Sequence, residues 1–197
     1  MKKMKKGLTE IIYVLDRSGS MRHLTGDTIG AYNSYLDEQK KADGKTIITT
    51  VLFDDKYELL FNGAQLDDAY LDHEKYYVRG MTALYDAVGK TILDVGHRLS
   101  KTPESERPEK VIFIITTDGY ENASKEFTQK KVKDMIEHQT EKYNWDFLFF
   151  GANIDTAEVA DTIGVNPDMA YDFEPSSKGI GRMMACCCEA TAKLRNK

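Results

Sequence analysis

The feature of this 197-residue sequence that most constrains its fold is the alternation of short apolar runs with longer segments of helical period. The short runs predict buried strands, and the longer segments predict amphipathic helices, because the two elements repeat their faces at different spacings. Strands and helices that alternate along a chain are typical of a mostly parallel sheet with helices on both faces. The sequence therefore predicts an α/β fold with three layers, α/β/α, around an open sheet.

Six strands are expected in that sheet. They are Glu10–Leu15, Lys45–Phe53, Tyr57–Phe61, Lys110–Thr116, Trp145–Gly151 and Met169–Phe173. The second and third are joined only by Asp54-Asp55-Lys56, a connection too short for the crossover that parallel strands require. These two strands must form an antiparallel hairpin. We therefore expect a mostly parallel six-stranded sheet with one antiparallel edge strand.

Helical period marks five segments between the strands and after the last of them. The segments are Thr28–Lys41, the helix opened by Gly80-Met81-Thr82, Thr128–Lys142, Thr156–Ile163 and a terminal helix capped by Ser176 or Ser177. The terminal helix has an apolar stripe that includes Cys187, and we expect this residue to pack in the core rather than bind a metal with its two neighbouring cysteines. The polar segment Lys101–Glu109 contains two prolines and is expected to form a surface loop.

Composition indicates an ordinary globular protein. Hydrophobic residues make up 41% and charged residues 30% of the chain, which excludes a disordered or low-complexity protein. A net charge of −5 provides no general attraction for nucleic acid or an anionic membrane, and no run approaches the ~20 apolar residues of a membrane span. The three consecutive cysteines suit a reducing compartment. We expect a cytoplasmic monomer, with residues 1–8 as a disordered basic N-terminus and 9–197 as a single domain.

Polar residues stand where three of the expected elements end or begin. The segment Asp16-Arg17-Ser18-Gly19-Ser20 follows the first strand, Thr82 lies in the loop before a long helix, and Asp118 follows the strand that ends at Thr116. Ligands of open α/β sheets bind at the carboxyl ends of the strands, so these side chains are expected to converge. Two carboxylates and three hydroxyls are hard oxygen donors of the kind that Mg²⁺ prefers. The predicted site for Mg²⁺ or Mn²⁺ consists of Asp16, Ser18, Ser20, Thr82 and Asp118.

Each part of this pattern also has a purely structural explanation. The segment at 16–20 is by itself typical of a turn followed by a helix cap, Thr82 of a helix N-cap, and Asp118-Gly119 of a common turn. Three such segments at strand ends together favour a shared site. Asp86, one helical turn beyond Thr82, is expected to bond loop backbone or to support a ligand rather than to contact the metal.

The order of these motifs is itself informative. Asp-x-Ser-x-Ser at 16–20, Gly-x-Thr-Ala at 80–83 and Thr-Asp-Gly at 117–119 follow one another on the expected elements. In this order and placement the chain resembles the von Willebrand factor type A domain with a complete metal-ion-dependent adhesion site, from about Thr9 to the last helix. Within this family it resembles the small stand-alone bacterial or phage members.

The resemblance implies a Rossmann-like fold and a role for each predicted ligand. Ser18 and Ser20 would bind the metal directly, and Thr82 would bind it directly or through water. Asp16 and Asp118 would be nearby carboxylates that often act through water. The resemblance also implies that an acidic side chain of a partner protein completes the coordination. The expected function is therefore metal-dependent protein binding, without enzymatic activity.

The alternative is a Mg²⁺-dependent hydrolase or phosphatase-like enzyme on a related α/β sheet, with Asp16 as the nucleophile. Aspartate phosphatases usually carry a second Asp two residues later, where this chain has Ser18. Phosphoryl transfer also calls for Lys or Arg clamps on the transferred group. A serine hydrolase would need His23 as general base, and nothing in the sequence orients it. The hydroxyl-rich set thus favours binding over catalysis.

Overall fold

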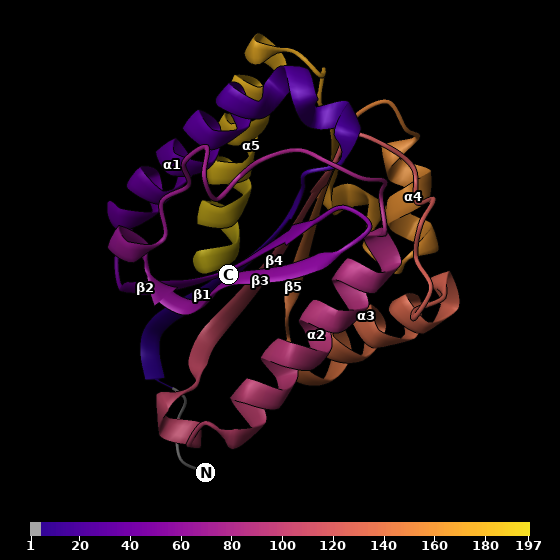
Figure 1. Ribbon diagram of the computed structural model, residues 1–197. Coiled ribbons are helices and arrows are strands. Elements are labelled where there is room, and N and C mark those ends of the chain that lie inside the picture. Colours follow the sequence, from indigo (N-terminus) through magenta and orange to yellow (C-terminus); the bar gives the residue numbers. More distant parts are fainter. Residues whose placement is uncertain (1–4) are drawn as a thin grey trace.

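The computed structural model describes residues 5–197, which contain a six-stranded sheet in the order β3-β2-β1-β4-β5-β6 (Figure 1). The strands are β1 (Lys5–Asp16), β2 (Lys45–Phe53), β3 (Tyr57–Gln65), β4 (Pro108–Thr117), β5 (Asp146–Gly151) and β6 (Ala170–Asp172). Neighbouring strands are parallel except for β2 and β3, which are antiparallel. The predicted mostly parallel sheet with one antiparallel edge strand is confirmed.

Helices cover both faces of this sheet (Figure 1). They are α1 (Thr25–Lys40), α2 (Leu84–Lys101), α3 (Gln129–Tyr143), α4 (Thr156–Thr162) and α5 (Ser177–Arg195), with short 3-10 helices η1 (Gly19–Leu24), η2 (Leu66–Asp68), η3 (Glu104–Glu106) and η4 (Pro167–Met169). Alternate side chains of β1 point to opposite faces. Ile11 and Tyr13 pack with α1 and α5, whereas Ile12 and Val14 pack with α2, α3 and α4. The central strands are therefore buried on both sides, as the α/β/α prediction requires.

The first strand is longer than the sequence pattern predicts. It begins at Lys5 rather than at Glu10, because Lys5 pairs through its backbone with Pro108 of β4, and backbone pairing does not require apolar side chains. Residues 5–8, expected in a disordered N-terminus, thus belong to the sheet. Residues 1–4 of that expected segment lie outside the described residues.

Boundaries of other elements also differ from the prediction, and those of β3 and α1 are two examples. β3 runs to Gln65 instead of ending at Phe61, because Gln65 still pairs with Ile47 beyond an irregularity in the ladder. α1 starts at Thr25 rather than at Thr28, directly after η1. Both differences arise because the predicted element covers only the residues with a clear apolar pattern.

The terminal helix α5 agrees with its prediction. Its buried residues include Cys187 of the expected apolar stripe, together with Ile180, Met183, Met184, Thr191 and Leu194. Ser176 caps it by accepting a hydrogen bond from the Gly179 N–H (3.0 Å), which decides between the two predicted caps. All three cysteines are free, and Cys187 is fully buried in the core. Its predicted packing role is confirmed.

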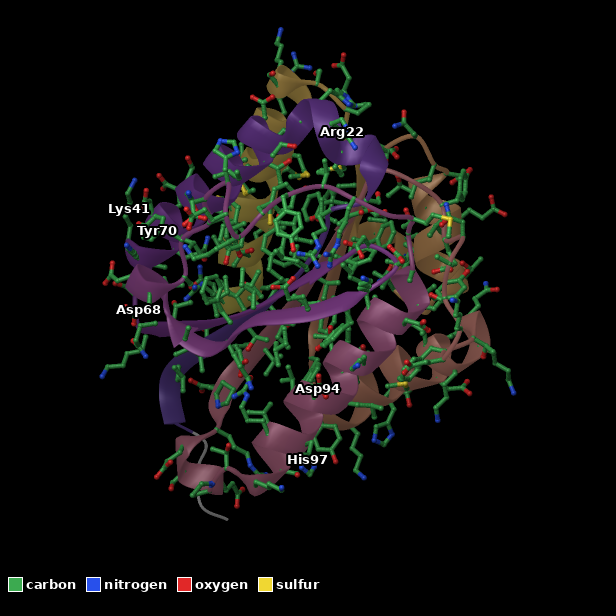
Figure 2. All side chains as sticks on the ribbon, viewed as in Figure 1. Arg22, Lys41, Asp68, Tyr70, Asp94 and His97 are labelled. Carbon is green, nitrogen blue, oxygen red and sulfur yellow. The ribbon has the colours of Figure 1, made fainter. Side chains whose placement is uncertain are left out.

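The surface carries mainly polar side chains, such as Lys41 after α1 and His97 on α2, both exposed (Figure 2). No helix within residues 5–197 combines the length and the apolar character needed to cross a membrane. Between η2 and α2, residues 69–83 form a connection without helix or strand, which we call the strap. Tyr76 of the strap donates a hydrogen bond to the backbone oxygen of Asp16 (2.8 Å), so the strap passes the carboxyl end of β1.

Candidate metal centre

Asp16 is the last residue of β1 and is fully buried. Its Oδ1 accepts a hydrogen bond from the Ser18 N–H (2.6 Å), and its Oδ2 accepts one from the hydroxyl of Thr117 at the end of β4 (2.7 Å). The carboxylate is therefore held between the two central strands. Ser18 precedes η1 as its N-cap residue but makes no side-chain capping bond. The structural explanation of this segment as a helix cap is thus wrong for Ser18.

A continuous chain of polar contacts connects the first loop to the loop after β4. The hydroxyls of Ser18 and Ser20 are 3.0 Å apart, and the Ser20 hydroxyl donates to Asp118 Oδ1 (2.5 Å). The other oxygen of Asp118, Oδ2, is buried and has no hydrogen-bond partner among the described residues. Ser20 itself is exposed, so solvent reaches the Ser20 side of this chain of contacts. The structure thus brings Asp16, Ser18, Ser20 and Asp118 together as predicted.

Thr82 reaches the same edge of the sheet on the strap. Its N–H donates to Asn122 Oδ1 (2.9 Å), and its carbonyl accepts from the Asn122 N–H (2.9 Å). Its hydroxyl oxygen lies 3.9 Å from the position that a Cβ on Gly119 would take, which places it beside Asp118. α2 begins only at Leu84, with Ala83 as its N-cap. Thr82 is therefore neither a cap nor the opening of the helix, and its side chain is available to the site.

Burial dominates the electrostatics of the two carboxylates. It raises the pKa of Asp16 to about 6; hydrogen bonds from Thr117 and Ser18 oppose this rise, and the charge of Asp118 adds to it. Burial also raises the pKa of Asp118, against the hydrogen bond from Ser20. Two neighbouring desolvated carboxylates are stabilised in their charged form by a cation. No three His, Cys, Asp or Glu residues within the described part of the chain are placed to hold a metal, so hydroxyls must complete any donor set here.

Asp86 and His23 have the positions that the sequence analysis favoured. Both oxygens of Asp86 accept hydrogen bonds from the backbone N–H groups of 125–127 (2.8–2.9 Å), which confirms its role in holding loop backbone. His23 lies with its Nε2 3.4 Å from the carbonyl oxygen of Pro175. That contact gives His23 no carboxylate to orient it as a general base.

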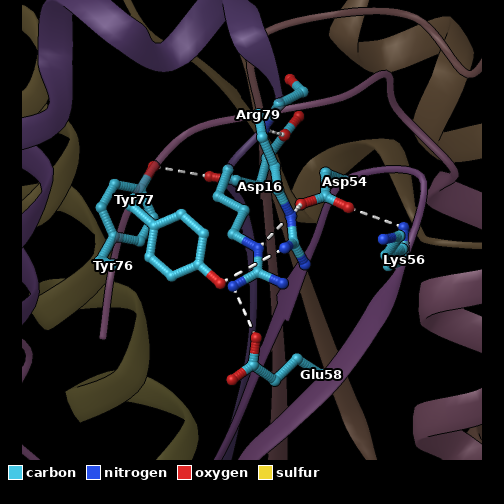
Figure 3. A network of polar contacts seen from close by, with 9 residues as sticks. Asp16, Asp54, Lys56, Glu58, Tyr76, Tyr77 and Arg79 are labelled. Carbon is cyan, nitrogen blue, oxygen red and sulfur yellow. Dashed lines mark hydrogen bonds and ion pairs between the residues drawn. The ribbon is translucent and has the colours of Figure 1, made fainter. Parts of the chain in front are cut away.

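An ionic cluster that the sequence patterns did not predict lies next to the site (Figure 3). Arg17, between Asp16 and Ser18 in the first motif, is fully buried, and its Nε lies 3.0 Å from Asp54 Oδ2. The same oxygen lies 2.7 Å from the Nε of Arg79 on the strap. Thr117 and Asn122 were missed as well. From the sequence, Asp54 is interpreted only as part of a hairpin turn. Its position directly after a strand is the signal that could have marked it as a residue near the site.

Solved structures share this arrangement of strands and helices. A von Willebrand factor type A protein from Catenulispora acidiphila superposes with a TM-score of 0.59 at 16% identity, over 98% of this chain and 43% of that chain. This chain has the von Willebrand factor type A fold. The fold expected from the order of the motifs is thereby confirmed.

Two other solved structures with this fold come from different settings. Proximal thread matrix protein 1 from the mussel byssus, in a form with a zinc-occupied MIDAS motif, has a TM-score of 0.63 at 16% identity, over 94% of this chain and 46% of that chain. The PilB minor pilin from Streptococcus sanguinis has a TM-score of 0.65 at 13% identity, over 98% and 62%. This chain spans less than two thirds of each of these proteins. No family model and no curated protein matches the sequence.

Proposed function

We propose that this domain is a metal-dependent protein-binding module in which Asp16, Ser18, Ser20, Thr82 and Asp118 hold Mg²⁺ or Mn²⁺. The observation that carries the proposal is the buried Oδ2 of Asp118, which has no hydrogen-bond partner in the described part of the chain. A desolvated carboxylate oxygen without a partner is unfavourable unless a cation neutralises it. The donor set fits a hard divalent cation, because every donor is an oxygen.

The composition of the donor set supports binding to an acidic partner. When bound, the cation would supply a positive centre that a carboxylate can ligate. Three of the five donors are neutral hydroxyls, so the chain itself contributes only two negative charges. A doubly charged ion in such a set keeps its attraction for a further anionic ligand. An Asp or Glu side chain of a partner protein would take that place.

The rim of the site supports a protein as the partner. Met81, next to Thr82, and Tyr120, two residues after Asp118, are each 56% exposed. The Tyr120 hydroxyl accepts a hydrogen bond from the Asp155 N–H (3.1 Å), which holds its ring at the surface. Exposed aromatic and Met side chains are enriched at protein interfaces. A partner would therefore place its acidic residue between apolar contacts.

We propose no enzymatic role for this site. Asp16 is fully buried, and both of its oxygens accept hydrogen bonds, so it is poorly placed to attack a substrate as nucleophile. A cytoplasmic location belongs to the same proposal and is supported by the three free cysteines.

Titration calorimetry with Mg²⁺ and Mn²⁺ tests the metal site. We expect one ion per chain and at least about tenfold weaker binding in Asp118→Asn, because the substitution removes a charged donor. Glu137→Gln on α3, which loses a surface carboxylate paired with Lys133 (3.9 Å), is the matched control and should bind as the wild type does. Absence of binding at millimolar metal, or equal affinity of Asp118→Asn and Glu137→Gln, would overturn the proposal.

A further inference from the structure

An ionic cluster connects the strap to the loops that carry the candidate metal ligands (Figure 3). Asp54, directly after β2, is fully buried and contacts both Arg17 (3.0 Å) and Arg79 (2.7 Å) through Oδ2. Its Oδ1 accepts a hydrogen bond from the Lys56 N–H (2.7 Å). Arg17 also pairs through Nη1 with Glu58 Oε2 (2.6 Å). We call Arg17, Asp54, Glu58 and Arg79 the latch.

Backbone hydrogen bonds join the same segments on either side of Thr82. The Arg79 N–H donates to the carbonyl of Arg17 (3.0 Å), and the Ala83 N–H donates to the carbonyl of Asp54 (2.9 Å). The carbonyl of Gly80 accepts from the Gly19 N–H (3.1 Å). Thr82 therefore lies in a short stretch of strap that is fixed at both of its ends.

Gly80 shows how closely the strap is held. Its φ is +66°, a backbone conformation that residues with a side chain rarely adopt. A Cβ at this position would lie 1.9 Å from Asp55 Oδ1. The strap thus approaches the β2–β3 turn so closely that a side chain at residue 80 would have to displace the Asp55 side chain.

Because Arg79 belongs to the strap, the latch holds this segment in position as well as contributing to stability. Buried ion pairs contribute little net stability, because desolvation offsets much of their attraction, but they favour one geometry. Arg79 is the member of the latch that comes from the strap, and its side chain is 37% exposed. The Tyr77 ring lies against both guanidinium groups, 5.2 Å from that of Arg17 and 5.3 Å from that of Arg79. Asp54 therefore fixes the strap at a point three residues before Thr82.

We propose that Asp54 and Arg79 are positioning residues that set the metal affinity of the site through Thr82. This inference rests on the proposed function. A neutral hydroxyl is a weak ligand, so it contributes to binding chiefly when its position is fixed before the metal arrives. Loss of the Arg79–Asp54 contact would leave the hydroxyl and the backbone hydrogen bonds around Thr82 in place, but it would remove the side-chain contact that helps to fix this stretch of the strap.

The test is a double-mutant cycle read by Mn²⁺ affinity in calorimetry. We expect Arg79→Gln to weaken Mn²⁺ binding about tenfold, within the range seen when the support of a ligand is removed. In a Thr82→Val background, which lacks the hydroxyl but keeps the branched shape, Arg79→Gln should have almost no further effect. Arg79→Lys keeps the charge and should restore part of the affinity. A merely structural role for Arg79 would give equal effects in both backgrounds.

Arg98→Gln is the matched control. It also breaks a contact between an arginine and a buried acid, Glu10, but midway along β1 and six residues before Asp16, so it should leave Mn²⁺ affinity unchanged. In metal-free protein, hydrogen exchange at the Arg79 and Ala83 amides should be faster in Arg79→Gln and unchanged in Arg98→Gln. If the wild type binds Mn²⁺ and Arg79→Gln binds equally well, or if the losses from Arg79→Gln and Thr82→Val add, only the positioning inference is overturned. If the wild type binds no Mn²⁺, the proposed function fails and the inference fails with it.

Discussion

Two acidic side chains, Asp54 and Glu10, are buried at different points along the sheet, and each is paired with arginine. At the carboxyl end, Asp54 contacts Arg17 and Arg79. Midway along β1, Glu10 accepts a hydrogen bond from the Thr49 hydroxyl (2.6 Å) and pairs with Arg98. Both acids are fully buried. Glu10 precedes the end of β1 by six residues, which is about 20 Å along an extended strand.

The two clusters have similar chemistry but connect different kinds of element. Arg98 belongs to α2, so the Glu10 cluster connects a regular helix to the sheet. Arg79 belongs to the strap, so the Asp54 cluster fixes a segment that has no helix or strand of its own. A helix is already held by its apolar face, whereas a connecting segment depends on such contacts for its position. The structural role of a buried ion pair therefore depends on the kind of element that the pair fixes.

The largest expected effect is on stability when the acids are removed one at a time. Asp54→Ala leaves Arg17 fully buried with Glu58 as its remaining partner, and we expect a loss of about 3–5 kcal/mol in the free energy of unfolding. Glu10→Ala should cost less, about 1–3 kcal/mol, because the Arg98 side chain is 26% exposed and can turn toward water. Urea unfolding of both variants measures the difference. Equal losses, or a larger loss in Glu10→Ala, would contradict this ranking.

Metal binding should stabilise the strap around Asp54 and leave the region around Glu10 unchanged. Saturation at 100 times the Kd should raise the free energy of unfolding by at most about 2.7 kcal/mol. The Arg79 and Ala83 amides of the strap should become better protected from hydrogen exchange. The Gly63 amide, which donates to the Thr49 hydroxyl beside Glu10 (3.0 Å), is the internal control. Chelation should lower the melting temperature and leave one cooperative transition; global unfolding on chelation, or equal new protection at Gly63, would be inconsistent with this prediction.

The smallest effect is expected when the whole Glu10 pair is replaced by apolar side chains. In Glu10→Leu with Arg98→Met, no buried charge is left without its partner, so the free energy of unfolding should change by no more than about 1 kcal/mol. Mn²⁺ affinity should stay within about twofold of the wild type, as is usual for distant sites. Urea unfolding and calorimetry provide the two values. A clear loss of metal affinity would show that the far cluster also supports the site.

The convergence of the candidate metal-binding side chains could be predicted from the sequence, but the ionic cluster beside them could not. Asp16, Ser18, Ser20 and Asp118 converge as expected, because the carboxyl ends of neighbouring parallel strands meet at one edge. Thr82 reaches the same edge, yet the helix that it was expected to open begins later, at Leu84. Local pattern marks where polar residues follow strands, and it fails where a tertiary contact overrides a helix signal.

The sequence by itself determined the layers of this protein, because the signals for them are local. These signals are the apolar period of the helices, the β-branched runs of the strands and the three-residue connection at Asp54-Asp55-Lys56. The tertiary structure alone decided the latch. Arg17, Asp54 and Arg79 are far apart in the chain and carry no periodicity that relates them. They meet only because β1 and β2 are neighbours and the strap returns past their carboxyl ends. An ion pair between distant residues is a property of the packed fold, since its energy depends on the burial that packing creates.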